Sequence, residues 1–300
     1  MSLIKNYIKT LIRSFRRDIF YSILNLLGLA IGLASAFLIF IYIQDELSYD
    51  RHFNDHERIY RLESFFTIKG KPDEFAITQI PLGPTMKDEF PEVEEYARLM
   101  DAGTTIFEKE EESFQEDSVY IADSTLFKVL SAQFLYGDPD KALSEPNTIV
   151  LSQSMANKYF GRTNVLGESL KTNNDENYLI TGVFSDLPWN THIRYNALIS
   201  SATIEQEIGA ERFNDRSAGS FWNVQVMTFI KLKPNTEMNP IFEKFPAFYD
   251  KYMRELGDQI DASFELRATN ITEIHYGSSS LQWDEPVGNK SYLYILSAVA

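Results

Sequence analysis

The sequence contains no cysteine, so neither a disulfide nor a thiolate metal site can form within this chain. A large folded domain here must therefore be held together by its hydrophobic core. The chain also lacks tandem repeats, low-complexity tracts and Gly/Ser-rich linkers, so composition marks no sharp domain boundary. Its 22 Phe and 16 Tyr residues are typical of well-filled cores rather than of disorder.

Charge is missing from one long stretch near the start of the chain. Residues Ile19 to Gln44 carry no charged side chain. At about 1.5 Å of rise per residue, a helix over this stretch exceeds the ~30 Å hydrocarbon core of a bilayer. The sequence therefore predicts a transmembrane helix over residues 19–44 and a membrane protein anchored near its N-terminus.

The flanks of this segment predict its direction. Basic residues precede it and acidic residues follow it, and an excess of Lys and Arg normally stays in the cytoplasm. We therefore expect a cytoplasmic N-terminus and an extracytoplasmic main domain. The basic residues are Lys5, Lys9, Arg13, Arg16 and Arg17, and the acidic ones are Asp45, Glu46 and Asp50.

A cleavable signal peptide is the alternative interpretation of the same segment. Ala34-Ser35-Ala36 has the small-x-small pattern of a cleavage site. Uncharged residues continue from Phe37 to Ile43 beyond that site, however, and the basic region ahead of the segment is unusually long. Both features favour a retained transmembrane helix.

Residues 1–18 have the pattern of an amphipathic helix on the membrane surface. Apolar residues recur at helical spacing, and polar and basic residues fill the other face. Such a helix lies flat in the interface, where each cation near anionic headgroups contributes about 1 kcal/mol. The expected anchoring residues are Lys5, Lys9, Arg13, Arg16 and Arg17, and the apolar face comprises Leu3, Ile4, Tyr7, Ile8, Leu11, Ile12 and Phe15. A positive flank that frays is the simpler alternative.

The rest of the chain is strongly acidic. The whole sequence has 43 acidic and 28 basic residues, and five of the basic ones lie within the first 18 residues. A protein that binds phosphates needs a cationic surface, so this composition argues against nucleic acid or anionic lipid as a ligand of the outer domain.

Strand-like and helix-like segments alternate over residues 45–290, which are enough for one large domain or two smaller ones. The fold class expected is α+β, with the transmembrane helix followed by a mixed α/β extracytoplasmic domain. Ser152 is a plausible N-cap of a helix over residues 152–160. A longer helix is expected at about residues 238–256, between strands over residues 222–232 and 262–269.

The last ten residues, 291–300, are apolar and follow Lys290, with Tyr292 and Tyr294 near the start. This pattern is typical of the outer end of a second transmembrane helix that the chain does not complete. A short buried C-terminal helix is the alternative.

We find no catalytic or cofactor motif. The only Gly-Lys pair, Gly70-Lys71, runs into Pro72 and cannot form a phosphate-binding loop. His52 and His56 have helical spacing but no evident third ligand, which favours a solvated turn over a metal site. His192 and His275 appear isolated in the sequence, so no catalytic triad is expected. Catalytic residues, cofactors and metals are therefore all predicted to be absent.

Small residues recur along one face of the predicted transmembrane helix. Gly28, Gly32 and Ala36 are spaced four apart, which would allow the backbone of another helix to approach closely. They are candidates for helix packing within the membrane. The alternative is that Gly and Ala are simply common in membrane helices.

Several short segments, taken in their order along the chain, form a recognisable set. The first are residues 22–32 (SILNLLGLAIG), 45–51 (DELSYDR) and 58–61 (RIYR). The set continues in the middle of the chain with Leu126-Phe127, Gly137-Asp138, Ala142-Leu143, Val150-Leu151-Ser152, Ala156, Tyr159-Phe160-Gly161, Leu166-Gly167, Tyr178, Thr181-Gly182-Val183, Asp186, Pro188 and His192. Together these segments resemble the permease subunits of MacB/FtsX-type ABC transporters.

This resemblance implies a non-catalytic permease subunit of the bacterial inner membrane with a MacB-like periplasmic core domain at residues 45–290. Its outer region would consist of two subdomains, one inserted within the other at about residues 116–221. The implied partners are a cytoplasmic ABC ATPase, a second permease copy and the lipid bilayer, with a periplasmic adaptor as a further candidate. Such subunits transmit ATP-driven motion across the membrane to export peptide, antibiotic or lipoprotein cargo, or to control an envelope process.

Two other classes of protein fit the same layout. A membrane-anchored extracytoplasmic sensor would also place a ligand domain beside one or two transmembrane helices. A membrane-anchored periplasmic enzyme is disfavoured because no catalytic constellation is visible. Sequence beyond residue 300 would distinguish the first two classes, since a permease has further transmembrane helices whereas a sensor has a cytoplasmic signalling domain.

Overall fold

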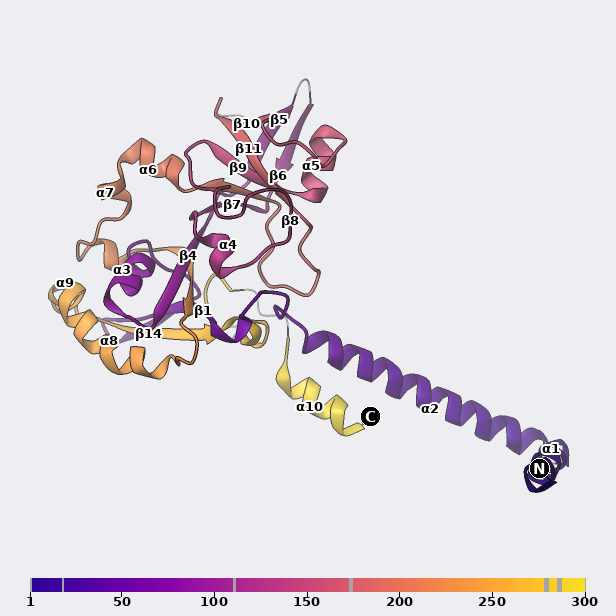
Figure 1. Cartoon of the computed structure of the whole chain (residues 1–300). Helices are drawn as coiled ribbons and strands as arrows, with labels where there is room; N and C mark the ends of the chain where they lie inside the picture. The colour runs from indigo at the N-terminus through magenta and orange to yellow at the C-terminus, as the bar shows by residue number, and fades with distance from the viewer. Residues whose placement is uncertain are drawn as a thin grey trace. The chain divides into compact units, whose positions relative to one another are not determined.

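The computed structural model of the chain describes residues 2–17, 19–109, 112–172, 175–277, 281–284 and 288–299 (Figure 1). Contacts divide the chain into two compact units, one comprising Met1–Ser48 and Gly288–Ala300 and the other Tyr49–Val287. Met1, Asp18 and Ala300, which stand at the ends of segments predicted from the sequence, lie outside the described residues. The predicted fold class, an apolar N-terminal helix followed by a mixed α/β domain, is confirmed.

The helices described in the first unit are α1 (Ser2–Arg17), α2 (Ile19–Glu46) and α10 (Lys290–Val299). Among the described residues, α2 is the one helix long and apolar enough to cross a membrane. None of its side chains is buried, as expected for a helix whose apolar surface faces lipid. Helix α10 contacts α2 within this unit, and its Leu293 is buried.

In the described residues of the second unit, 14 strands form one continuous sheet. Its main path runs β14-β1-β13-β4-β7-β12-β9-β11-β10-β5-β6, with β2, β3 and β8 paired to its side. The strands are β1 (Ile59–Ile68), β2 (Lys71–Phe75), β3 (Thr78–Gln79), β4 (Val93–Asp101), β5 (Thr105–Lys109), β6 (Glu112–Glu116), β7 (Val119–Ala122), β8 (Phe134–Gly137), β9 (Thr148–Ser152), β10 (Ser169–Thr172), β11 (Asn177–Phe184), β12 (Ala197–Ser200), β13 (Val224–Leu232) and β14 (Ala262–Asn270).

In the sequence, the helices of the second unit alternate with these strands. The α-helices are α3 (Leu82–Glu89), α4 (Leu126–Val129), α5 (Gln153–Phe160), α6 (Ala202–Ile208), α7 (Ala210–Phe213), α8 (Asn239–Tyr252) and α9 (Arg254–Ile260). Three 3₁₀ turns, η1 (His56–Arg58), η2 (Ser220–Trp222) and η3 (Ile271–Tyr276), complete the unit.

One half of this sheet consists of the four strands β14-β1-β13-β4, all antiparallel to their neighbours. The connections β1-α3-β4 and β13-α8-β14 each skip one strand, which is the split βαβ arrangement of a ferredoxin-like fold. Alternate strand residues such as Leu62, Ile230 and Phe264 pack with Leu82 and Phe245 in one core cluster. Helices α3, which carries Leu82, and α8, which carries Phe245, therefore cover the same face of the four strands.

The other half contains β5 to β12 and lies, in sequence, between β4 and β13 of the ferredoxin-like half. The halves join where β4 pairs with β7. A buried ion pair reinforces this seam, with Arg98 donating to both carboxylate oxygens of Asp123 at 2.8 Å. Arg98 also donates to the carbonyl of Ile80, so its positive charge is well coordinated.

Two of the glycines in the segments that carry the family resemblance lie directly opposite each other. Gly137 of β8 pairs directly with Gly182 of β11. A Cβ on Gly137 would lie 2.4 Å from the carbonyl oxygen of Thr181, and the φ of Gly137 is +92°. The two strands approach so closely that only glycine fits at this position.

Local predictions from the sequence compare well with these elements. Ser152 caps α5 as expected, since its hydroxyl accepts a hydrogen bond from the amide of Met155. The single helix expected over residues 238–256 is instead two helices that meet at Met253. Met253 is buried and its carbonyl accepts a hydrogen bond from the Trp222 indole, so tertiary contacts redirect the chain there.

Candidate functional site

We call the second unit, Tyr49–Val287, the folded unit. Near its start, a buried carboxylate links its first residues to a distant loop. Asp50 is fully inaccessible to solvent and has a positive φ of 58°. It accepts hydrogen bonds from the hydroxyl of Thr191 at 2.6 Å, from the amide of His192 at 3.1 Å and from Nδ1 of His192 at 2.7 Å. The amide of Asp50 in turn donates to the carbonyl of Asn190. We call Asp50, Thr191 and His192 the first anchor.

The electrostatics of this anchor favour the ionised carboxylate. Burial by itself would raise the pKa of Asp50, because desolvation disfavours charge. Hydrogen bonds and charge from His192, together with the Thr191 hydroxyl, outweigh burial and hold the pKa of Asp50 below its ordinary value. The first anchor is therefore strongest when Asp50 is charged.

The expectation that His192 is isolated was wrong, because the fold brings Asp50 to it across 142 positions of sequence. Among the residues that the structure describes, no third side chain completes a catalytic triad with this pair. Thr191 donates to Asp50 rather than to the imidazole, and Nε2 of His192 is buried without a hydrogen-bond partner in the described part of the chain. The geometry is that of a structural Asp-His pair rather than an activated nucleophile.

Aromatic rings pack beside the first anchor. Tyr49 stacks on the ring of His275, with centroids 3.5 Å apart, and contacts Trp189 edge to face. Tyr49 and His275 are buried, whereas Trp189 is 62% exposed. These contacts connect the first residue of the folded unit to η3 and to the loop that carries His192.

A second buried ionic group lies near the C-terminal end of the folded unit. Arg61 of β1 donates to both oxygens of Asp284, at 2.9 and 2.8 Å, and to Glu63 at 2.8 Å. Arg61 and Glu63 are buried. The backbone of Gln282 also bonds with Glu74 and Ala76, so this segment is attached to the ferredoxin-like half. We call Arg61, Glu63 and Asp284 the second anchor.

The two anchors attach to different halves of the sheet. Asp50 follows α2 by four residues and binds the loop after β11, in the inserted half. Asp284 precedes α10 by six residues and binds β1, in the ferredoxin-like half. Neither group was predicted from the sequence, although Asp50 and His192 each lie in a segment that carries the family resemblance.

The histidines considered as metal ligands have other neighbours. His56 lies within 3.3 Å of the Phe53 carbonyl, and the ring of His52 packs against that of Phe53. Within the described ranges, no three His, Asp or Glu side chains are grouped so that they could hold a metal ion.

The residues predicted for the membrane lie on α1 and α2. No atom lies within 4 Å of a Cβ built on Gly28 or Gly32, so both positions are open, whereas Ala36 is partly covered. On α1 the five cations are exposed, as are Tyr7 and Ile8. The side chains of Leu3, Ile4, Leu11, Ile12 and Phe15 lie outside those described.

The fold and the two anchors together define a class: a mixed α/β domain that follows an apolar helix of membrane-spanning length and has a buried ionic group near each of its ends. Comparison with known proteins agrees with this class. The profile of the MacB-like periplasmic core domain matches residues 22–247, so the chain belongs to this family. No curated protein matches the chain.

The chain is similar to solved structures of permease domains. A domain of a putative permease protein from Porphyromonas gingivalis has a TM-score of 0.62 and 22% identity, covering 81% of this chain and 98% of that domain. The periplasmic region of MacB from Actinobacillus actinomycetemcomitans has a TM-score of 0.45 and 15% identity, covering 72% of this chain and 90% of that one. The extracellular domain of the transporter YknZ from Gram-positive bacteria has a TM-score of 0.43 and 13% identity, covering 70% and 100%.

Proposed function

We propose that this chain is a non-catalytic permease subunit that carries ATP-driven movement from the membrane to its periplasmic domain. Membership of the MacB-like family supports a cytoplasmic ABC ATPase as the source of that movement. The basic residues before α2 and the acidic ones after it support a cytoplasmic N-terminus in the inner membrane of a bacterium. The cargo would be a peptide, an antibiotic or a lipoprotein, or the output would be control of an envelope process.

The observation that carries this proposal is the separate attachment of the two membrane helices. A shift of α2 relative to α10 would pull Asp50 and Asp284 in different directions. Because Asp50 is bound to the inserted half and Asp284 to the ferredoxin-like half, the shift would act across the seam between β4 and β7. This seam pairs only three residues of each strand, and the main path of the sheet passes from one half to the other there, so we propose it as the place where the halves move.

The proposal keeps the predicted organisation of the chain. Residues 1–18 would lie on the cytoplasmic membrane surface, residues 19–44 would span the bilayer, and residues 45–290 would form the periplasmic core. The inserted subdomain is proposed at about residues 116–221, although β5 and β6, which begin before residue 116, pair into the same half of the sheet. Residues 291–300 would begin a second transmembrane helix.

Helix packing in the membrane is part of the same proposal. Ala36, Ile39 and Ile43 are partly covered and share one face of α2, and α10 contacts α2. Gly32 and Gly28 continue this face further along the helix. We expect them to accept the backbone of α10 or of a helix from a second permease copy, where close packing supplies the association.

The test is a distance measurement in the full complex with its ATPase. Spin labels at Asn157→Cys on α5 and Glu243→Cys on α8 report on the two halves, and the chain has no other cysteine. We expect the distance distribution to shift when ATP is bound, and Asp50→Ala to reduce that shift. Asp88→Ala, which removes an exposed pair with Arg216, is the matched control. Identical distances with and without ATP, in a complex that hydrolyses ATP, would rule out the proposed coupling.

A further inference from the structure

The strand at one edge of the sheet is open and bordered by a groove. Within the described residues, β14 pairs with β1 alone, so alternate backbone N–H and C=O groups point away from the sheet. A groove of about 580 Å³ is lined by all six residues from Phe264 to Thr269. Successive strand residues point to opposite faces, so a groove that touches all six runs along the free edge itself.

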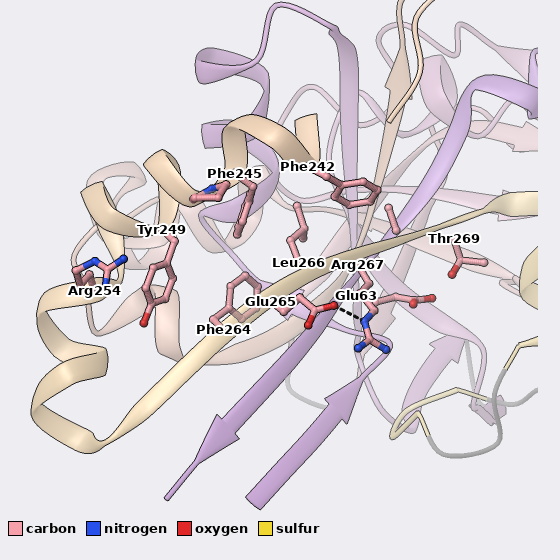
Figure 2. A pocket seen from close by; sticks show the side chains of 12 residues that line it. Glu63, Phe242, Phe245, Tyr249, Arg254, Phe264, Glu265, Leu266, Arg267 and Thr269 are labelled. Atoms are coloured by element: carbon pink, nitrogen blue, oxygen red, sulfur yellow. Dashed lines mark hydrogen bonds and ion pairs between the residues drawn. The ribbon is translucent and has the colours of Figure 1, made fainter. Parts of the chain in front are cut away.

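One wall of this groove is an apolar stripe of α8. Phe242, Phe245 and Tyr249 lie at helical spacing and face β14 (Figure 2). Phe242 and Tyr249 are only partly buried although they are large aromatic side chains. An added strand could pair with β14 and lie beneath this stripe at the same time.

The charges on β14 indicate which strand would fit. Glu265 and Arg267 are the exposed charged residues of the strand, and both point to the face opposite α8. They form a 2.7 Å ion pair with each other, and the guanidinium of Arg267 stacks on the ring of Phe65 at 3.5 Å. Arg267 is therefore held in place while still about half exposed.

We propose that two copies of this chain pair through β14, antiparallel, about a two-fold axis at Leu266. In this register Glu265 of each copy lies opposite Arg267 of the other, so both cross-strand pairs are of opposite charge. Phe264 lies opposite Ala268, which places a large side chain against a small one beneath α8. Leu266 is the central residue of Ala262–Asn270, so all nine residues of the strand find a partner.

The other edge of the sheet lacks this complementarity. In β6 (Glu112–Glu116), the same antiparallel pairing about Phe114 would place Ser113 opposite Gln115, and neither residue is charged. Glu116 is buried in an ion pair with Lys158, so it offers no exposed charge to a second copy. The self-complementary edge is therefore β14 rather than β6.

The proposed function assumes a dimer, and this inference rests on it by naming β14 as the strand through which the two copies pair. The test of this pairing requires no ATPase. Two differently tagged full chains are co-expressed, one with Glu265→Cys and the other with Arg267→Cys. Directly opposite residues have Cα atoms about 4.5–5.5 Å apart, within reach of a disulfide, whereas two copies of position 265 would be offset by about two residues along the strand. We expect a disulfide between the two tags and none when either variant is expressed alone.

Two controls make the result decisive. Ser113→Cys with Gln115→Cys has the same spacing on β6 and should form no disulfide. A pair of cysteines in α2 monitors dimers that form through the membrane alone. If α2 cross-links and β14 does not, the β14 pairing is overturned while the proposed function stands, and the groove is left for a strand from another protein.

Charge reversal separates pairing between copies from the ion pair within one copy. Glu265→Lys and Arg267→Glu each place like charges opposite one another, and we expect each to weaken self-association by about tenfold. Mixing the two variants restores opposite charges between copies, although the Glu265-Arg267 pair remains broken inside both. Recovery of association in the mixture supports the register, and failure to recover overturns it.

Discussion

Replacing Asp50 by alanine is the most direct test of the first anchor. The change removes the acceptor of three hydrogen bonds and leaves the Thr191 hydroxyl, which is buried, and the His192 amide and Nδ1, which are mostly buried, without this partner. Removing one member of a buried pair costs about 3–5 kcal/mol, and each unsatisfied buried donor costs about 1–3 kcal/mol. We expect Asp50→Ala to lower the free energy of unfolding by about 3–5 kcal/mol.

The assay is urea unfolding of the purified chain in detergent, followed by tryptophan fluorescence. In a folded unit of this size, such a loss corresponds to a fall in Tm of roughly 10 °C. The control is Asp186→Ala, because Asp186 is exposed and accepts two hydrogen bonds from Ser154 on the neighbouring helix α5. We expect the control to change stability by no more than about 1 kcal/mol.

A double-mutant cycle with His192→Ala isolates the interaction between the two side chains. The single variants should not be additive, because each removes the same contact. A loss below about 1 kcal/mol for Asp50→Ala, or full additivity with His192→Ala, would refute the view that this anchor is held by the carboxylate.

The same anchor predicts a pH dependence. The folded-state pKa of Asp50 lies below its ordinary value of 3.8. The stabilisation is therefore fully present above about pH 4 and is lost as the pH falls through the lowered folded-state value. The difference in stability between the natural chain and Asp50→Ala should shrink in this acidic range. An unchanged difference down to pH 2 would contradict this assignment.

Two further predictions concern glycines. Gly137→Ala should lower the free energy of unfolding in urea by at least about 1–3 kcal/mol, because the added Cβ would lie 2.4 Å from the Thr181 carbonyl oxygen. The control for backbone strain alone is Gly103→Ala, since Gly103 has a positive φ but no atom near its Cβ. Equal losses for the two variants would exclude the steric explanation. Gly32→Leu should leave unfolding of Tyr49–Val287 unchanged but weaken assembly with other membrane helices. Unchanged cross-linking in membranes would contradict a packing role for this face of α2.

The order of elements was largely readable from the sequence, because local chemistry dominates there. The uncharged run after Ile19 specified α2 through hydrophobicity and length. Ser152 specified the start of α5 through its capping hydroxyl. The break at Met253 was not readable, because it depends on a contact with Trp222 from another part of the chain.

The candidate site was not readable in the same way. Asp50 and His192 are separated by 142 positions, and Arg61 and Asp284 by 223. Single charged residues at such separations look like any other surface charge. Only burial distinguishes them, and burial depends on where the strands place each segment.

The sequence by itself determined that a helix of membrane-spanning length precedes an acidic, cysteine-free α/β region, since hydrophobic periodicity and charge are properties of neighbouring residues. The tertiary structure alone decided which carboxylates are buried, which half of the sheet each end of the folded unit is attached to, and which strand edge stays open. These features depend on strand order and register, which bring together residues that are far apart in the chain.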